Sequence, residues 1–450
     1  MQVGSTYLIN YIKLLLVHIL IGVAVFLFKP VSKVLLLAIV GYFLIRVFSE
    51  WNRNNEVLIA AAYITGFEVF SRMTGGALTY EFAKYAVIMF LVIGMFFKGF
   101  NRSSWPYIIY IFLLVPGVMF SAINLNYESS VADAVGFNLS GPVALGISAL
   151  YCYNSRITMN RLQEILLAFL LPIITTTAYL FLYTPDIRDV ITNTASNFAA
   201  SGGYGPNQVA TVLGLGMFVL FTRLFIVKNY FVNLIDLTLL VLVTYRGIVT
   251  FSRGGIITAA ICAVLFMMVY FLHSEARERS RLLPKVGLIA ALIAFTWIFS
   301  SLTTFGLIDK RYANQDAAGR EKEDLTSGRI EILNSELEAF YEYPVTGIGV
   351  GKVKEYRMAK TGVKSASHNE MSRLLSEHGL FGMFAIILLL IVPLVFRMRN
   401  RRNFYLFSFL AFWFFTINHS SMRIAAPAFI YGLALINLVN GVPKSALHRK

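Results

Sequence analysis

Two arginines and one histidine supply the residue types that a transfer reaction on a phosphorylated substrate needs. Arg253 and Arg329 each adjoin a glycine, and His368 lies in the segment Ser367-His368-Asn369-Glu370. A guanidinium stays charged at physiological pH and makes bidentate contacts to phosphate oxygens, so two of them suit a diphosphate. A histidine can accept a proton from a sugar hydroxyl near neutral pH. These residues therefore suit transfer from a diphosphate to a hydroxyl group.

Arg329 and His368 both lie in a polar interval, 303–379, between two long hydrophobic parts of the chain. A structureless connection of that length is improbable, so we expect the interval to fold. From Ser327, apolar residues recur at three- and four-residue spacings, and Pro344 follows. This pattern predicts an amphipathic helix with Arg329 in its first turn. Its apolar stripe should pack against the membrane surface or the ends of the spans: Ile330, Leu333, Leu337 and Phe340.

A second helix is predicted to begin at Ser367, where the sequence fits an S-x-x-E capping box and Gly379 stands where a C-cap glycine belongs. His368 would then occupy the first helical position. The helix N-terminus and nearby arginines should disfavour its charged form and keep it ready to act as a base. The alternative is a surface histidine that only caps the helix, and His378 and His419 remain competitors for the role.

Two glycine-rich turns are candidate binding elements. Gly347-Ile348-Gly349-Val350-Gly351 can bring backbone amides close to an anion. The segment 202–208 contains three glycines and Pro206, which is expected at the first position of a helix. A helix N-terminus beside glycines makes an anion or sugar site feasible, with Asn207 as its side chain. An ordinary turn into a helix is the alternative.

The composition indicates that these residues are positioned by helices that span a membrane. Of the 450 residues, 57% are hydrophobic and 14% charged, which indicates an all-α polytopic membrane protein. We expect twelve to fourteen transmembrane helices. The apolar runs fall at about 8–28, 34–48, 57–71, 82–97, 107–120, 137–153, 162–183, 207–222, 231–250, 255–272, 286–302, 380–396, 404–417 and 426–440.

The net charge of +15 points to topology rather than to nucleic acid. The interval 303–379 holds 11 basic and 12 acidic residues, so the positive excess lies in the short connections elsewhere. By the positive-inside rule, the basic connections after the tenth and twelfth spans are cytoplasmic, as are both termini, and 303–379 is extracytoplasmic. The connection after the tenth span carries Arg277, Arg279, Arg281 and Lys285. The connection after the twelfth span carries Arg397, Arg399, Arg401 and Arg402. No cleaved signal peptide is expected.

Several ionisable residues fall inside or beside the spans. Arg246 and Arg253 stand seven residues apart around a break at 251–255, and either faces a cavity or partner, or snorkels to lipid phosphate. Glu68 and Arg72 are four residues apart and are predicted to form an intrahelical ion pair. Asp236 is expected to be structural. Cys152 and Cys262 each lie in an apolar run, so we expect no disulfide framework and no metal.

Six segments together resemble the O-antigen ligase and Wzy polymerase superfamily. They cover roughly 200–395 in the family's order, and the part from Pro344 to Gly382 is the most specific. The segments are Gly205-Pro206-Asn207-Gln208-Val209-Ala210, Ser252-Arg253-Gly254-Gly255, Gly328-Arg329, Tyr343-Pro344-Val345-Thr346-Gly347-Ile348-Gly349, Ser367-His368-Asn369 and Glu377-His378-Gly379-Leu380-Phe381-Gly382.

The resemblance implies a GT-C-like glycosyltransferase of the bacterial inner membrane that needs no metal or other cofactor. It implies transfer of a glycan, with inversion, from an undecaprenyl-diphosphate carrier to an acceptor on the periplasmic side. By carry-over, Arg253 and Arg329 hold the diphosphate and His368 activates the acceptor hydroxyl. We add Arg246 to the expected diphosphate site. Asn207, Asn369 and Glu370 are the expected glycan contacts.

The expected organisation is 1–302 with helices 1–11, a folded periplasmic loop at 303–379 with two helices, and 380–450 with helices 12–14 and a short cytoplasmic tail. An O-antigen ligase, with lipid A core as acceptor, is the preferred function. A Wzy-type polymerase, whose acceptor is a growing glycan, and a protein O-oligosaccharyltransferase remain alternatives. A flippase is the rival from another class, but transporters usually keep their polar residues near the bilayer midplane with repeat symmetry.

Overall fold

The computed structural model describes residues 4–126, 130–322, 328–362, 365–399 and 403–439. Ser327, the basic residues Arg401 and Arg402, and the tail 440–450 lie outside these ranges. The described part is almost entirely helical, with β1 (Arg156–Thr158) and β2 (Asn437–Val439) as a short parallel pair. The all-α prediction is confirmed.

Thirteen of the fourteen predicted apolar runs coincide with helix, whereas the last, 426–440, is helical only as far as Ala434 and contains β2. Within the described residues, ten helices are long and apolar enough to cross a membrane: α1 (Ser5–Leu27), α2 (Val31–Ser49), the stretch Arg102–Asn124 with α5 (Trp105–Leu113) and α6 (Val115–Asn124), α7 (Val131–Cys152), α8 (Met159–Tyr183), α9 (Pro206–Ile226), α10 (Tyr230–Ile248), α11 (Arg253–His273), α12 (Ala276–Thr303) and α16 (Glu370–Arg399). The other four runs form α3 (Glu56–Met73), α4 (Phe82–Lys98), α17 (Leu406–Ser420) and α18 (Ala425–Ala434). The chain is a polytopic membrane protein.

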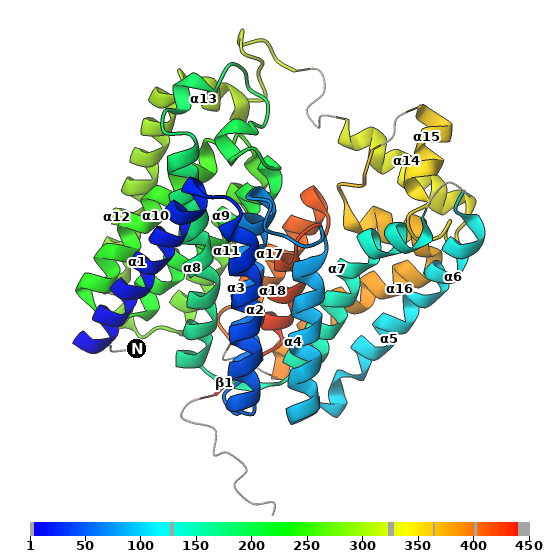
Figure 1. Cartoon of the computed structure of the whole chain (residues 1–450), viewed down its shortest axis with the longest axis horizontal. Helices are drawn as coiled ribbons and strands as arrows, with labels where there is room; N and C mark the ends of the chain where they lie inside the picture. The colour runs from blue at the N-terminus through cyan, green and yellow to red at the C-terminus, as the bar shows by residue number, and fades with distance from the viewer. Residues whose placement is uncertain (1–3, 127–129, 323–327, 363–364, 400–402, 440–450) are drawn as a thin grey trace, which may run out of the picture. The chain divides into compact units, whose positions relative to one another are not determined.

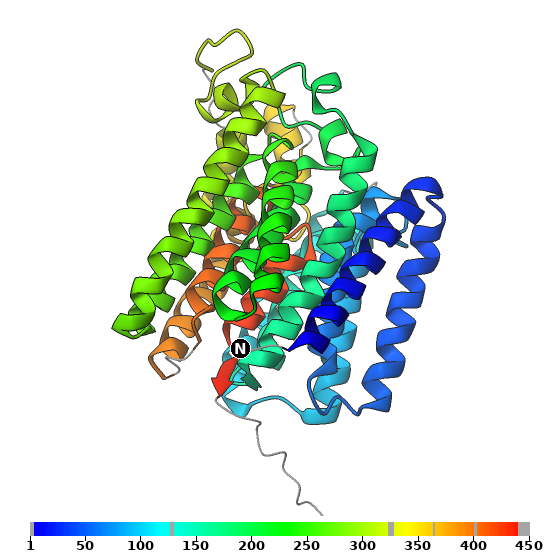
Figure 2. The same cartoon turned by 90° about the vertical axis from the view of Figure 1, so that its left-hand side faces the viewer.

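Contacts divide the chain into two compact units, one of which contains residues 1–50, 58–80 and 159–323. In this first unit α9 is central, since 19 of its 21 residues are buried against α8, α10 and α11, and a helix that is apolar all round belongs inside. Figure 1 shows these helices side by side, and Figure 2 shows α1 along α8.

Ion pairs inside the first unit match the sequence predictions. Arg72 and Glu68 form the expected pair at 2.5 Å. Asp236 of α10 accepts a hydrogen bond from Arg223 of α9 at 3.0 Å, with both side chains fully buried. Buried charges are retained only when they are paired, and the pair of Arg223 and Asp236 holds α9 against α10.

The second unit contains residues 51–57, 81–158 and 324–450. Its spans pack α7 against α4 and α18, and α17 against α18. Between its candidate spans it also contains α14 (Arg329–Glu342) and α15 (Val353–Thr361), which lie beside each other in Figure 1. The predicted helix with Arg329 in its first turn is α14. The sequence did not predict α15, or the short α13 (Leu307–Tyr312) of the first unit.

The buried face of α14 differs from the predicted apolar stripe. Its buried residues are Ser335, Glu336 and Ala339, whereas Ile330 is 53% exposed. The reason is electrostatic, because Glu336 turns inward to pair with Arg357 of α15 at 2.7 Å. An inward carboxylate rotates the helix away from the orientation that hydrophobicity alone would select.

Gly379 interrupts α16 as a C-cap glycine would, with φ of 60° and ψ of −135°. The turn lets Leu380 donate its backbone N–H to the carbonyl of Pro344 at 2.7 Å. A Cβ at this position would lie 2.5 Å from that carbonyl oxygen, so only glycine fits. The break separates the polar start of α16 from its apolar part, which follows.

We therefore expect Gly379→Ala to destabilise the protein by roughly 3–5 kcal/mol, from backbone strain plus the clash with Pro344. Gly362→Ala is the matched control, because Gly362 has φ of +71° but open space around it. The control should lose only about 1–2 kcal/mol. Thermal unfolding of both variants in one detergent measures the difference, and equal losses would contradict the role given to Pro344.

Candidate active site

His368 lies in a short loop just before α16 rather than inside it. The side chain of Asn369 accepts from the backbone N–H groups of Met371 and Ser372, at 2.9 and 3.3 Å, so Asn369 is the N-cap. Ser367 instead bonds the backbone of Asn369. The predicted capping box is therefore wrong by two residues, and His368 precedes the helix instead of opening it.

Backbone contacts hold this loop from several directions. The carbonyl of His368 accepts from the N–H of Ser421 at 3.1 Å. Arg423 donates to the carbonyl of Ser367 at 2.9 Å. Arg357 donates to Ser365 while it pairs with Glu336. The position of the imidazole is thus fixed by α15, by α14 and by the turn after α17.

The environment of His368 keeps its imidazole neutral. Burial, followed by the positive charges of Arg423, Arg329 and Arg357, lowers the pKa of His368 to about 4. Its Nδ1 atom is buried and has no hydrogen-bond partner among the described residues. A neutral histidine with an unused ring nitrogen can accept a proton from a hydroxyl group brought next to it.

The sequence analysis missed Arg423, whose charge has the largest electrostatic effect on His368. The signal was present, since Arg423 ends a polar interval between two apolar runs, where arginines usually face a partner or cavity. Arg329, at the first turn of α14, was predicted, and its charge also acts on His368. The second unit therefore gathers arginines around one neutral histidine.

The two competing histidines differ in their placement. His378 is fully buried, and a Cβ on Gly117 would come within 2.2 Å of its Nδ1, so a glycine is needed for it to fit. His419 directs its Nδ1 to the carbonyl of Phe415 at 2.7 Å, and it lies close enough to His368 to influence the pKa of His368. His419 is thus a neighbour of His368, whereas His378 is packed away in the core.

Glu370, predicted to contact glycan, is engaged within the protein. It is 1% exposed, pairs with Arg373, and accepts from the N–H of Met422 at 3.3 Å. Arg373 also pairs with Glu377 at 2.5 Å. These contacts occupy the carboxylate of Glu370, which therefore joins α16 to the turn before α18. The side-chain oxygen of Asn369 is likewise occupied, because it caps α16.

The glycine-rich turn 347–351 does bind an anion, but the anion belongs to the chain. Gly351 donates its N–H to a carboxylate oxygen of Glu377 at 2.8 Å. Ile348 and Gly349 donate to the carbonyls of Ser376 and Glu377 at 2.9 and 3.2 Å. These hydrogen bonds give the turn a structural role, because they connect it to the first part of α16.

A small cavity of about 20 Å³ lies beside this loop. It is lined by Ser367, Glu370, Arg373 and Arg423, together with residues of α7 and of the turn before α18. The volume suits one water molecule, and the lining is polar. The lining therefore contains polar side chains on both sides of His368 in the sequence, namely those of Ser367 and Glu370.

In the first unit, the predicted residues Asn207 and Arg253 start neighbouring helices. Ser252 donates its hydroxyl to the side-chain oxygen of Asn207 at 2.7 Å. Gly255 permits this contact, because a Cβ there would lie 2.1 Å from the carbonyl oxygen of Ala210 on α9. Pro206 opens α9 as predicted. The break between α10 and α11 falls just before the glycine pair, not at it.

Arg253 belongs to a group of cations at the start of α11. Its guanidinium donates to the side chain of Asn314 and to the carbonyl of Arg311. Burial and the charges of Arg311 and Arg253 lower the pKa of Lys322. Mutual repulsion of this kind marks a place where an anion is favourable. Neither Arg311 nor Lys322 was singled out in the sequence.

Arg246 is placed differently from the other expected phosphate ligands. It is fully buried in α10, and it donates to the carbonyls of Thr184 and Ala200 at 3.2 and 3.0 Å. Its guanidinium also lies over the ring of Phe181. These contacts anchor the connection 184–205 and favour a structural role.

Among the described residues, no group of three or more His, Cys, Asp or Glu side chains is arranged to hold a metal ion. The family model described as O-antigen ligase matches residues 238–387. Residues 238–387 form an O-antigen ligase domain. The predicted superfamily is thus confirmed on a range that contains Arg253, Arg329 and His368, whereas Asn207 and Arg423 lie outside the match.

Beyond the O-antigen ligase domain, similarity is limited. An uncharacterized protein of Haemophilus influenzae is 26% identical over 208 residues, which is 43% of this chain and 50% of the relative. The chain therefore spans half the length of this relative. No solved structure matches the chain.

Proposed function

We propose that the protein is an O-antigen ligase of the bacterial inner membrane, acting on its periplasmic side. It transfers a glycan from an undecaprenyl-diphosphate carrier to a hydroxyl group of lipid A core. The observation that carries this proposal is the neutral His368 beside Arg329 and Arg423, with His368 and Arg329 inside the range matched by the O-antigen ligase family. This arrangement pairs a proton acceptor with cations suited to phosphate.

In the proposed reaction, the acceptor hydroxyl attacks the anomeric carbon and its proton passes to His368. The bond between that carbon and the diphosphate oxygen breaks, and the carrier diphosphate leaves with the electron pair. Attack from the face opposite the leaving group inverts the configuration. Arg329 and Arg423 stabilise the charge that develops on the leaving phosphate. Arg253 also binds the carrier diphosphate.

Binding of the donor should raise the pKa of His368, the proposed general base. Without a donor, burial and then the charges of Arg423, Arg329 and Arg357 lower the pKa of His368 to about 4. A bound diphosphate offsets the charges of Arg329 and Arg423, and this favours protonation of the imidazole. The pKa of His368 should therefore rise when the donor is present, in the direction in which a general base becomes more effective.

Reconstitution tests the function directly. Purified protein in detergent is mixed with undecaprenyl-diphosphate glycan and with lipid A core, a single-repeat carrier or an acceptor peptide in parallel. Transfer to lipid A core supports the proposal. Elongation of the repeat instead indicates a polymerase, transfer to serine or threonine indicates protein glycosylation, and no transfer to any acceptor would reject the enzyme in favour of a transporter.

A further inference from the structure

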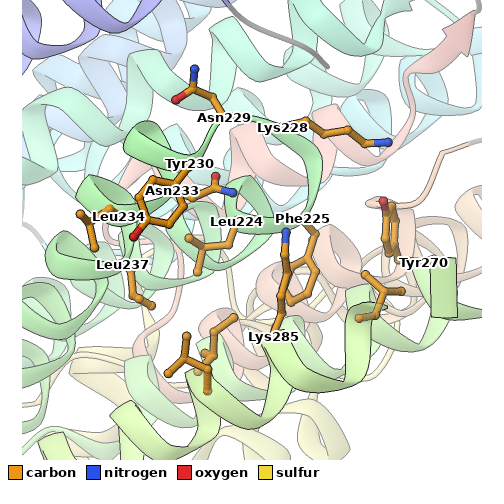
Figure 3. A pocket seen from close by; sticks show the side chains of 13 residues that line it. Leu224, Phe225, Lys228, Asn229, Tyr230, Asn233, Leu234, Leu237, Tyr270 and Lys285 are labelled. Carbon is orange, nitrogen blue, oxygen red and sulfur yellow. The ribbon is translucent and has the colours of Figure 1, made fainter. Parts of the chain in front are cut away.

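A second binding element lies in the first unit at the far ends of α9 and α11. It is a cavity of about 600 Å³ between the end of α9, the first turns of α10, the end of α11 and the start of α12. Cavities of this size hold small ligands. Figure 3 shows the thirteen side chains that line it.

The position of this cavity follows from helix length. Asn207 and Arg253 lie at the N-terminal ends of α9 and α11, whereas the cavity is lined by residues at their C-terminal ends, such as Phe225 and Tyr270. Each helix has 21 residues, which at about 1.5 Å per residue spans about 30 Å, the thickness of the hydrocarbon core. The cavity therefore lies at the membrane face opposite Arg253.

The lining combines positive charge with an apolar wall. Lys228 and Lys285 both line the cavity, and its described lining contains no carboxylate. In the view of Figure 3, the ends of these lysines and the hydroxyl of Tyr270 lie to the right of Leu234 and Leu237. Leu234 is 50% exposed, so the apolar side continues to the surface of the unit.

A polar atom within the lining also lacks a partner. The side-chain oxygen of Asn233 is buried and accepts no hydrogen bond from the described residues. Leaving such an acceptor unsatisfied is unfavourable, so a donor group on a ligand is favourable there. The ligand should therefore combine a negative charge, a hydroxyl donor and a hydrocarbon part.

We propose that this cavity binds an anionic phospholipid of the leaflet opposite Arg253, with its phosphate at Lys228 and Lys285 and its acyl chains along Leu234 and Leu237. A glycerol headgroup supplies the hydroxyl donor for Asn233. Basic pockets between transmembrane helices recognise anionic headgroups in this way. A soluble anion would leave the leucine wall without a partner. This site does not depend on the proposed transfer reaction.

Lipid binding to the purified full-length protein tests the proposal by native mass spectrometry. Dioleoyl phosphatidylglycerol is compared with dioleoyl phosphatidylcholine, which has the same chains but no net charge. The wild type should retain phosphatidylglycerol preferentially. Since one basic residue contributes about fivefold in affinity at a membrane surface, Lys228→Gln with Lys285→Gln should weaken phosphatidylglycerol binding by about thirtyfold and leave phosphatidylcholine unchanged.

Two further variants make the result specific. Lys13→Gln removes an exposed lysine of α1 in the same unit and should change nothing. Leu237→Trp fills the apolar side with both lysines intact and should also weaken phosphatidylglycerol binding. Unchanged phosphatidylglycerol binding in the double lysine variant would overturn the proposal. So would lysine-dependent binding of undecaprenyl phosphate in preference to phosphatidylglycerol, since that would make the cavity a carrier site.

Discussion

His368→Ala should lower single-turnover glycan transfer by about 100- to 10,000-fold, the usual contribution of a general base. The variant should still bind the carrier lipid, because Arg253 and Arg329 are untouched. Folding should survive, since the loop is held through the backbone carbonyls of Ser367 and His368 and through the cap on Asn369. The measurement is transfer from purified carrier lipid beside a carrier-binding assay.

The neighbouring histidine provides the control. His419→Gln should retain most activity, while His368→Gly should recover part of its transfer when free imidazole is added. If His368→Ala loses less than about tenfold, or if His419→Gln loses more than His368→Ala, His368 is not the base.

The pH dependence of activity also tests whether His368 is the general base. Neutral imidazole is the active form, so activity falls as pH drops through the pKa of His368. For the free enzyme, which kcat/KM reports, that pKa is about 4, and the profile should stay flat from about pH 8 to 5. The kcat profile should fall at a higher pH, because the bound diphosphate raises the pKa of His368. Coincident profiles would contradict an electrostatic link between donor and base.

Arg253→Lys is expected to lower carrier binding or transfer by roughly 10- to 100-fold although the charge is retained. A lysine ammonium cannot form the bidentate contacts of a guanidinium, and hydrogen bonds to charged groups contribute about 1.5–3 kcal/mol each. In this protein the lysine would also lose the contacts to Asn314 and Arg311 that orient the side chain.

An arginine of the same unit serves as the matched control. Arg188 is exposed and pairs with Asp186 at 2.8 Å, so Arg188→Lys should leave carrier binding unchanged. Binding isotherms and single-turnover rates for the two variants, measured at one salt concentration, separate a ligand from a surface charge. Wild-type behaviour of Arg253→Lys would reduce Arg253 to an anchor at the membrane surface.

Hydrophobic periodicity predicted most of the fold because lipid-facing and core-facing helices both require long apolar runs. It also predicted local starts, such as Pro206 at the first position of α9, since a proline there loses no hydrogen bond. Ser367 and Asn369 are both good capping residues, and the sequence alone does not decide which of them caps α16.

Long-range pairing accounts for the features that the sequence did not predict. Glu336, Arg357 and Arg373 were not singled out in the sequence, yet all three are buried in ion pairs. Glu336 and Arg357 are 21 residues apart, and no periodicity marks such a partner. The inward rotation of α14 and the structural use of Glu370 both follow from these pairs.

The backbone contacts around Gly379 also determine how often the segment 344–351 separates transiently from the segment 376–380. The N–H groups of Ile348, Gly349, Gly351 and Leu380 are all bonded between the segments 344–351 and 376–380. An amide bonded in this way exchanges with deuterated water only when both segments separate together. These four amides should therefore be protected as a set, and their common opening free energy gauges how firmly the segment 344–351 stays attached to α16.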